Sequence, residues 1–99
     1  MAAPARLADS DIATRLKTLP GWSLEGAKLH KAFTFKDFVE AWGFMSAVAL
    51  VAESMGHHPE WSNVWNRVTV DLTTHDAGGV SALDFDLAAR MEGFAGKRP

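Results

Sequence analysis

The chain has 99 residues and a formal net charge of −2, with 47% hydrophobic and 22% charged residues, a profile typical of one globular domain over residues 1–99. The slight negative charge gives no electrostatic case for binding nucleic acid or an anionic membrane. The absence of cysteine excludes disulfides, thiolate metal sites and a cysteine nucleophile.

No membrane-directed segment is expected. The chain starts without the apolar stretch of a secretory signal. Its longest uninterrupted apolar run, residues 47–52, is far too short to span a bilayer. We therefore expect a cytoplasmic protein with no membrane partner. Residues 96–99 are expected to form a frayed tail.

The first third of the chain predicts a short helix and a strand pair. Residues 7–18 have apolar side chains at helical spacing, and Asp9 or Ser10 can cap the start of that helix. Residues 22–24 and 29–33 then read as two strands joined by a tight turn.

The second helix has a strong set of start and stop signals. Thr34 is expected to be its N-cap and Asp37 the third-position acid of a capping box. Phe33 and Phe38 are expected to form the hydrophobic staple across that start. The helix is expected to end at Gly56, in the position where a left-handed residue is favoured.

This helix carries two apolar stripes, whereas packing on one sheet requires only one. The first stripe comprises Phe38, Trp42, Met45, Ala49 and Ala52, and the second comprises Phe44, Val48, Val51 and Met55. A single wide buried face would explain both stripes. We favour a helix packed on its own sheet and on a second subunit, because so small a chain has few elements left to cover both.

The second half of the chain predicts a β-hairpin and a third helix. Residues 60–65 and 67–73 are expected to pair around Asn66, and apolar and polar side chains alternate in the second strand. After a loop, Ser81 and Asp84 have the spacing of a capping box. The order of elements predicts an α+β protein with helices layered on one face of an antiparallel sheet.

Three histidines follow element ends, where functional groups are often placed. His57 and His58 come after the long helix, and His75 comes after the last strand. Three histidines could form an open zinc site. Adjacent residues in an extended segment point in opposite directions, however, so His57 and His58 converge poorly on one ion. His30, in a strand, is expected to face solvent without a function.

Proton transfer on a bound organic ligand is the second hypothesis for these histidines, because histidine titrates near neutral pH. Trp61 could form a flat wall against an aromatic ring, whereas we expect Trp65 to belong to the core. The polar candidates near the histidines are Glu53, Thr73, Thr74, Asp76 and Asp84. Each also has a structural explanation as a turn residue, a cap or a solvated acid.

These residues resemble a known family. The run from Glu53 through His57-His58-Pro59-Glu60-Trp61 to Val68, the later Thr73-Thr74-His75-Asp76 and the helix start at Ser81 and Asp84 look like pterin-4a-carbinolamine dehydratase. The resemblance covers the chain from about residue 7 to residue 91.

The resemblance implies a four-stranded antiparallel sheet with three helices packed on one face. It implies dimers that extend the sheet, often paired into tetramers through the long helix. It implies a hydro-lyase that removes water from 4a-hydroxytetrahydropterin to give quinonoid dihydropterin, in tetrahydrobiopterin recycling, with neither metal nor other cofactor.

The resemblance also implies roles for individual residues. His57 and His75 match the acid/base histidines, and His58 matches a histidine that chiefly binds and positions the pterin. Thr73, Thr74 and Asp76 match the substrate-contacting segment around His75. Further positions around the same pocket are Glu53, Gly56, Trp61 and Asp84, and Gly56 stands where members often carry Asp or Asn.

Two other hypotheses remain open. Members of this fold also serve as dimerisation partners of a transcription factor or as assembly chaperones, which would make the protein an interaction module. A zinc-dependent hydrolase using the same histidines is the third hypothesis.

Overall fold

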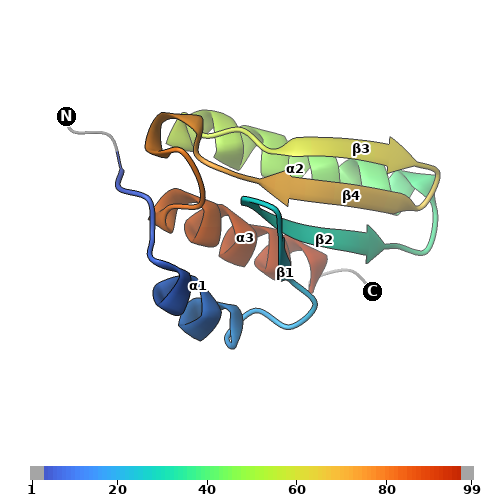
Figure 1. The fold of residues 1–99 in the computed structure, drawn as a ribbon. Coiled ribbons are helices and arrows are strands. Elements are labelled where there is room, and N and C mark those ends of the chain that lie inside the picture. The colour runs from blue at the N-terminus through green and yellow to red at the C-terminus, as the bar shows by residue number, and fades with distance from the viewer. Residues whose placement is uncertain (1–3, 97–99) are drawn as a thin grey trace.

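A computed structural model describes residues 4–96, and its elements follow the predicted order (Figure 1). In chain order they are α1 (Asp9–Leu16), β1 (Ser23–Glu25), β2 (Lys28–Thr34), α2 (Phe38–Met55), β3 (Glu60–Val64), β4 (Arg67–Leu72), the short 3₁₀ helix η1 (His75–Ala77) and α3 (Ala82–Ala95). The strands form one antiparallel sheet in the spatial order β1-β2-β4-β3. The predicted α+β class is confirmed. Of the predicted frayed tail, residues 97–99 lie outside the described residues.

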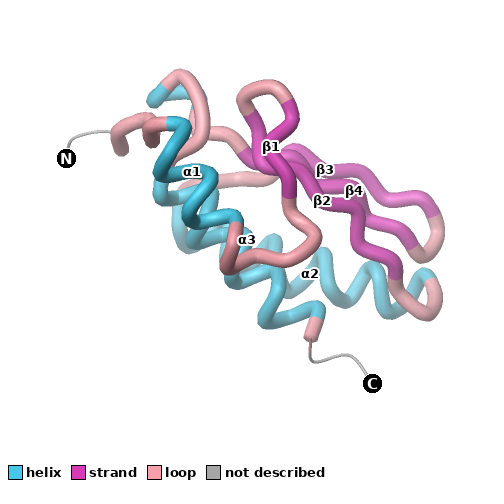
Figure 2. The backbone as a smooth tube through the Cα atoms, turned by 60° about the horizontal axis from the view of Figure 1, so that its bottom comes forward, coloured by secondary structure: helices cyan, strands magenta, loops and turns pink. Residues whose placement is uncertain are grey.

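The helices cover one face of the sheet (Figure 2), and the buried side chains of that face are apolar. Alternate residues of β4 are fully buried on that face, as the period-2 pattern predicts: Val68, Val70 and Leu72. The opposite face carries polar groups. There, His30 of β2 and Glu60 of β3 lie on either side of Asp71 of β4 in the strand register. His30 is half-buried and its Nδ1 lies 2.9 Å from Oδ1 of Asp71.

The expected start of α1 was wrong. The N-cap residue is Ala8, whose side chain cannot cap, and neither Asp9 nor Ser10 takes that role. The backbone N–H of Leu7 donates to the carbonyl of Val80 at 2.9 Å, which keeps the chain extended up to this point. The helix begins at Asp9, whose acidic side chain is favoured by the positive end of the helix dipole.

The expected start of α2 was also wrong. Strand β2 continues through Thr34, so this residue pairs with β4 instead of capping the helix. Asp37 is the N-cap, and its side chain accepts a hydrogen bond from the backbone N–H of Glu40 at 2.8 Å. The staple does not form at this start, because Phe33 is buried in the core and Phe38 is 47% exposed.

Helix α2 buries one face, which does not coincide with either predicted stripe. Phe44 and Val48 of the second stripe are buried together with Ala52 of the first. Trp42 of the first stripe is 54% exposed, and Leu50, which was in neither stripe, is 76% exposed. The length of α2 and its mean hydropathy of 1.3 would also suit a membrane span, and 22% of its residues are buried. The buried face packs into the core with the sheet, which is the arrangement of a core helix that keeps a second apolar face uncovered.

The β3–β4 turn corrects the expectation for Trp65. This residue is 64% exposed and has a φ of 49°, so it forms the turn and does not belong to the core. The turn is tied to the link between β2 and α2: Asn66 Nδ2 donates to the carbonyl of Phe35 at 2.9 Å, and the N–H of Phe35 donates to the carbonyl of Asn66 at 2.8 Å.

Three element ends meet at one end of the molecule (Figure 1). Helix α2 ends at Gly56, which is left-handed with a φ of 62°, as predicted. Strand β4 leads into a loop that is closed by a bridge between Thr74 and Gly79. Helix α3 then begins at the N-cap Ser81 with the predicted capping box. The residues that follow α2, those that follow β4 and those that open α3 are thus brought together.

Candidate active site

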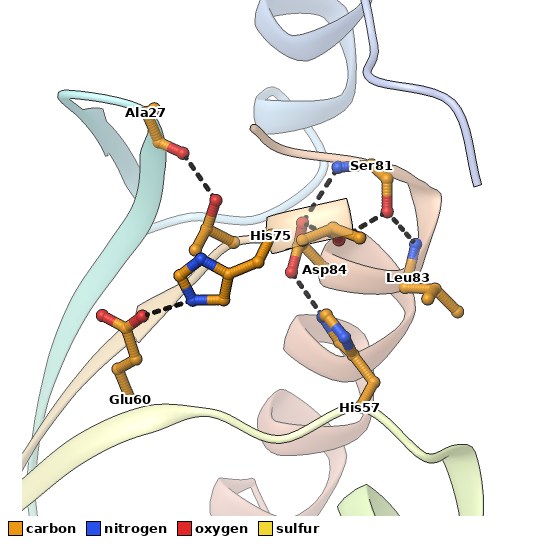
Figure 3. Close-up of polar contacts among 9 residues, drawn as sticks. Ala27, His57, Glu60, His75, Ser81, Leu83 and Asp84 are labelled. Carbon is orange, nitrogen blue, oxygen red and sulfur yellow. Dashed lines mark hydrogen bonds and ion pairs between the residues drawn. The ribbon is translucent and has the colours of Figure 1, made fainter. Parts of the chain in front are cut away.

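The innermost part of the site is a hydrogen bond between His57 and Asp84 (Figure 3). Nε2 of His57 lies 2.6 Å from Oδ1 of Asp84, and the aspartate is fully buried. The other carboxylate oxygen accepts from the hydroxyl of Thr74 at 2.8 Å and from the backbone N–H of Ser81 at 2.9 Å. Asp84 therefore completes the capping box of α3 and holds the histidine that follows α2.

The hydrogen-bond directions in this buried network are determined by its members. Because the single hydroxyl hydrogen of Thr74 goes to Asp84, the 2.7 Å contact between Thr74 and Ser81 requires Ser81 Oγ to donate. Ser81 Oγ in turn accepts from the N–H of Leu83 at 3.2 Å. An ionised carboxylate only accepts, so Nε2 of His57 carries the hydrogen and Nδ1 is left for other partners.

His58 has a different partner from its neighbour. Its Nε2 lies 2.8 Å from Oε1 of Glu53, one turn back along α2, and both side chains are mostly exposed. Glu53 was one of the predicted polar candidates near the histidines, and it contacts His58 directly. The two adjacent histidines diverge, one toward the protein interior and the other along the outside of α2.

His75 is held by Glu60, which also bonds to Lys28. Nε2 of His75 lies 3.2 Å from Oε2 of Glu60 (Figure 3). Nζ of Lys28 donates to Oε1 of the same carboxylate. The hydrogen bond from Lys28, aided by that from His75, lowers the pKa of the Glu60 carboxyl below its ordinary value. The same contact with Glu60 raises the pKa of the Lys28 ammonium.

A pocket of about 280 Å³ lies among these groups, close to the lower limit of small-molecule sites. It is lined by Pro4, Gly56, His57, His58, Thr73, Thr74, His75, Asp76 and Leu83. Most of the predicted site residues are therefore in one place. The hydroxyl hydrogens of the two threonines are already used, since Thr73 donates to the carbonyl of Ala27 at 3.1 Å and Thr74 donates to Asp84. These threonines can offer a ligand oxygen lone pairs or backbone groups.

Three predicted residues do not line the pocket. Glu53 and Asp84 lie behind it, each bonded to one histidine. Trp61 is partly buried against the core and is not a wall of the pocket. In the strand register it pairs with the buried Val70, so its side chain belongs to the helix-covered face of the sheet.

Four residues of the site were not predicted from the sequence: Glu60, Ser81, Leu83 and Pro4. A signal existed for Ser81, because its capping box with Asp84 was predicted and Asp84 was a site candidate. Glu60 reaches His75 only through the pairing of β3 with β4, and Pro4 reaches the pocket only through the bond of Leu7 to Val80. Such long-range contacts have no local pattern.

A larger groove of about 540 Å³ lies between the end of α2 and α3. It is lined by Met55, Leu83, Asp86, Ala89 and Arg90, which include no histidine. We place the candidate site in the smaller pocket because acid/base groups converge there. Within residues 4–96, no group of three or more histidine or acidic side chains is arranged to hold a metal ion.

Comparisons with known proteins identify the family of the chain. The family model described as pterin 4 alpha carbinolamine dehydratase matches residues 5–94. A relative from Rhodopseudomonas palustris, provisionally named a pterin-4-alpha-carbinolamine dehydratase, is 56% identical, and the match covers 91% of each chain. A relative of the same provisional name from Novosphingobium aromaticivorans is 54% identical, with 91% of this chain and 96% of the relative covered.

Two solved structures share the fold. A protein from Brucella melitensis described as a transcriptional coactivator/pterin dehydratase has a TM-score of 0.88 and 44% identity, with 91% of this chain and 98% of that chain covered. A pterin dehydratase-like protein described as a RuBisCO assembly factor has a TM-score of 0.64 and 23% identity over 78% of this chain and 89% of its own, and it supports the fold alone. The chain belongs to the pterin-4-alpha-carbinolamine dehydratase family.

Proposed function

We propose that this protein is a hydro-lyase that converts 4a-hydroxytetrahydropterin to quinonoid dihydropterin and water, in tetrahydrobiopterin recycling in the cytoplasm. Family membership supports this activity, and one observation of the site carries it. The pocket gathers three histidines, and each has its Nε2 against a carboxylate. Acid/base catalysis needs such groups held at fixed positions and able to exchange protons near neutral pH.

The reaction breaks the bond between C4a and the hydroxyl oxygen and forms a double bond between C4a and N5. One histidine gives a proton to the leaving oxygen, which departs as water. The proton on N5 goes to a second histidine or to solvent. Histidines on opposite sides of the planar ring could each protonate a hydroxyl on its own face. Positioned acid/base groups typically contribute about 10²–10⁴-fold in rate.

We assign roles to the three histidines from the family resemblance. Burial distinguishes only His57, because the side chains of His58 and His75 are 62% and 79% exposed. His57 is only 8% exposed and is fixed by Asp84, which suits an acid/base group in one geometry. His75, from the loop after β4, is the second acid/base group. His58 is largely exposed beside Glu53 and serves chiefly to bind and position the pterin. The remaining substrate contacts are assigned to Gly56, Thr73, Thr74 and Asp76.

The test is stopped-flow measurement of the dehydration of a 4a-hydroxytetrahydropterin with and without the protein. We expect acceleration by the native chain and a loss of about 10²-fold or more in the His57→Ala and His75→Ala variants. His30→Ala is the matched control, because His30 also pairs with a carboxylate but lies away from the pocket. No acceleration by the native chain, or full activity after both substitutions, would overturn the proposal.

We also propose that the protein forms a homodimer or homotetramer. Phe38, Val39, Trp42 and Leu50 of α2 are between 47% and 77% exposed. No charged residue lies between Glu40 and Glu53 on this helix. An exposed apolar face of this kind marks an interaction surface. A second copy of the chain, presenting the same face, would cover it.

The same surface supports a second candidate function, a non-catalytic interaction module. The similar Brucella protein carries the description of a coactivator as well as that of a dehydratase. Such a module would retain a different protein in stoichiometric amounts on its α2 surface. A native chain that binds such a partner but does not accelerate the dehydration would favour the module over the enzyme.

A further inference from the structure

Each of the three pocket histidines contacts a carboxylate: Asp84, Glu53 or Glu60. Of these three acids, Glu60 was not predicted to belong to the site. It opens β3, and its two oxygens have different partners: Oε1 accepts from Lys28 of β2, and Oε2 contacts His75 beyond β4. Asp71 lies opposite Glu60 in the strand register and adds a second negative charge near Lys28. Glu60 thus joins the polar face of the sheet to His75, which lines the pocket; Figure 3 shows the contact between the two side chains.

The histidine held by Glu60 has little other support. The side chain of His75 is 79% exposed and belongs to a three-residue 3₁₀ helix. Among the hydrogen bonds of residues 4–96, the bond to Glu60 is the one made by its ring. If the bond to Glu60 were lost, no other hydrogen bond among the described residues would hold the His75 ring in one rotamer.

The contact also determines where the ring carries its hydrogen. An ammonium group only donates, so Lys28 keeps Glu60 ionised and oriented. An ionised carboxylate only accepts, so Nε2 of His75 must be the donor. Nδ1 of the neutral ring then keeps its lone pair and is the nitrogen available to a substrate.

We propose that Glu60, anchored by Lys28, is a positioning residue that holds His75 in one rotamer and in the Nε2–H tautomer. This inference rests on the proposed function, because it deepens the role of His75 as an acid/base group. The geometry itself can be tested without any substrate.

The variant Glu60→Gln tests the tautomer. Its amide oxygen should turn toward the Lys28 ammonium, which leaves the amide NH₂ facing His75. A donor at this position requires a lone pair on Nε2, so the hydrogen should move to Nδ1. We expect ¹⁵N correlation spectra, recorded near pH 9 and hence above the ordinary histidine pKa of about 6.5, to show this inversion for His75.

A second substitution and a matched control make the result specific. Adding Lys28→Met to Glu60→Gln frees the amide to turn its oxygen to His75, so the Nε2–H tautomer should return. Glu25→Gln is the matched control. It removes the same charge from β1, where Oε2 of Glu25 lies 4.0 Å from Nε2 of His30, and it should leave the spectrum of His75 unchanged. An unchanged tautomer in Glu60→Gln, or an equal change in Glu25→Gln, would overturn the proposal.

Kinetics give the functional measurement. We expect Glu60→Gln to lower kcat for the dehydration about three- to fivefold with little change in KM. This factor corresponds to the interaction free energy of one solvent-exposed ion pair, here the contact between Glu60 and His75. A native chain without dehydratase activity would overturn the proposed function and leave the spectroscopic result standing. If the native chain is active but Glu60→Gln changes neither the tautomer of His75 nor kcat, this inference alone would be overturned.

Discussion

Asp84 is the residue on which the folding of α3 and the geometry of His57 both depend. Its buried carboxylate accepts from His57, Thr74 and the backbone of Ser81. Within residues 4–96, no buried side-chain nitrogen or oxygen lacks a partner. Removing this acceptor would leave three donors unsatisfied at once, and each such group costs about 1–3 kcal/mol.

We therefore expect Asp84→Ala to lower the free energy of unfolding by about 3–5 kcal/mol, measured by urea denaturation. Asp84→Asn, which keeps the volume and one acceptor, should lose less and provides a folded variant if the alanine variant does not fold. Asp86→Ala, on the exposed side of the same helix, is the control and should change stability by no more than about 0.5 kcal/mol. Equal losses in Asp84→Ala and Asp86→Ala would contradict this role.

The pair of Lys28 and Glu60 makes stability depend on pH at both extremes. The pKa of Glu60 is lowered from 4.5, so its contribution is present above that value and is lost as the pH falls through the folded-state pKa. The pKa of Lys28 is raised from 10.5, so its contribution is present below that value and is lost as the pH rises further.

Lys28→Met should consequently be less stable than the native chain at pH 7, and the difference should shrink below about pH 4. Denaturation of both proteins from pH 3 to pH 7 measures this difference. Lys17→Met, at the C-cap of α1, is the control and should show no such dependence. A difference that stays constant down to pH 3 would count against the pair.

At the level of elements, α2 and its C-cap hold two glycines with opposite conformational demands. Gly43 is in the helix interior, and an added Cβ would meet nothing within 4 Å. Gly56 ends the helix with a φ of 62°, a conformation that side chains with a Cβ disfavour.

Gly43→Ala should raise the stability by about 0.5–1 kcal/mol through helix propensity. Gly56→Ala should lower it by about 1 kcal/mol through backbone strain. Thermal unfolding of the two variants, compared with the native chain, checks both signs. The same sign for both substitutions would mean that φ at residue 56 does not control the end of α2.

Local signals predicted the helix at Ser81 correctly and failed at Thr34, although both have the spacing of a capping box. Ser81 follows a loop and is free to take the N-cap position. Thr34 is held in β2 by its pairing with β4, and long-range strand pairing overrode the local preference. Strand pairing also explains why Trp65 is exposed and not in the core. The pairing of β3 with β4 places this residue in the hairpin turn, whatever its hydrophobicity.

For the molecule as a whole, the uncovered face of α2 predicts self-association. Trp42→Lys should convert an oligomer to a monomer, or weaken its assembly by at least about 30-fold, because a buried interface tryptophan typically contributes 2 kcal/mol or more. Size-exclusion chromatography with light scattering over a range of concentrations measures this change. Ala13→Lys, on the exposed side of α1, is the control. A native chain that is monomeric at all concentrations would exclude this assembly.

The overall architecture and most of the pocket could be predicted because they follow from periodicity and element ends. The contacts that complete the site could not. The register of β3 against β4 places Glu60 next to His75. The same register places Trp61 on the helix-covered face of the sheet, away from the pocket. A shift of one residue in that register would exchange the faces of the whole strand.

The double role of Asp84 affects how relatives of this protein should be interpreted. A descendant that no longer handled substrate would still be selected to keep this carboxylate, because α3 cannot start well without it. Its presence in another sequence is therefore weak evidence of activity. His75 is exposed on a short loop and has no comparable structural role. Whether a related sequence keeps or loses His75 is therefore better evidence about its activity than whether it keeps Asp84.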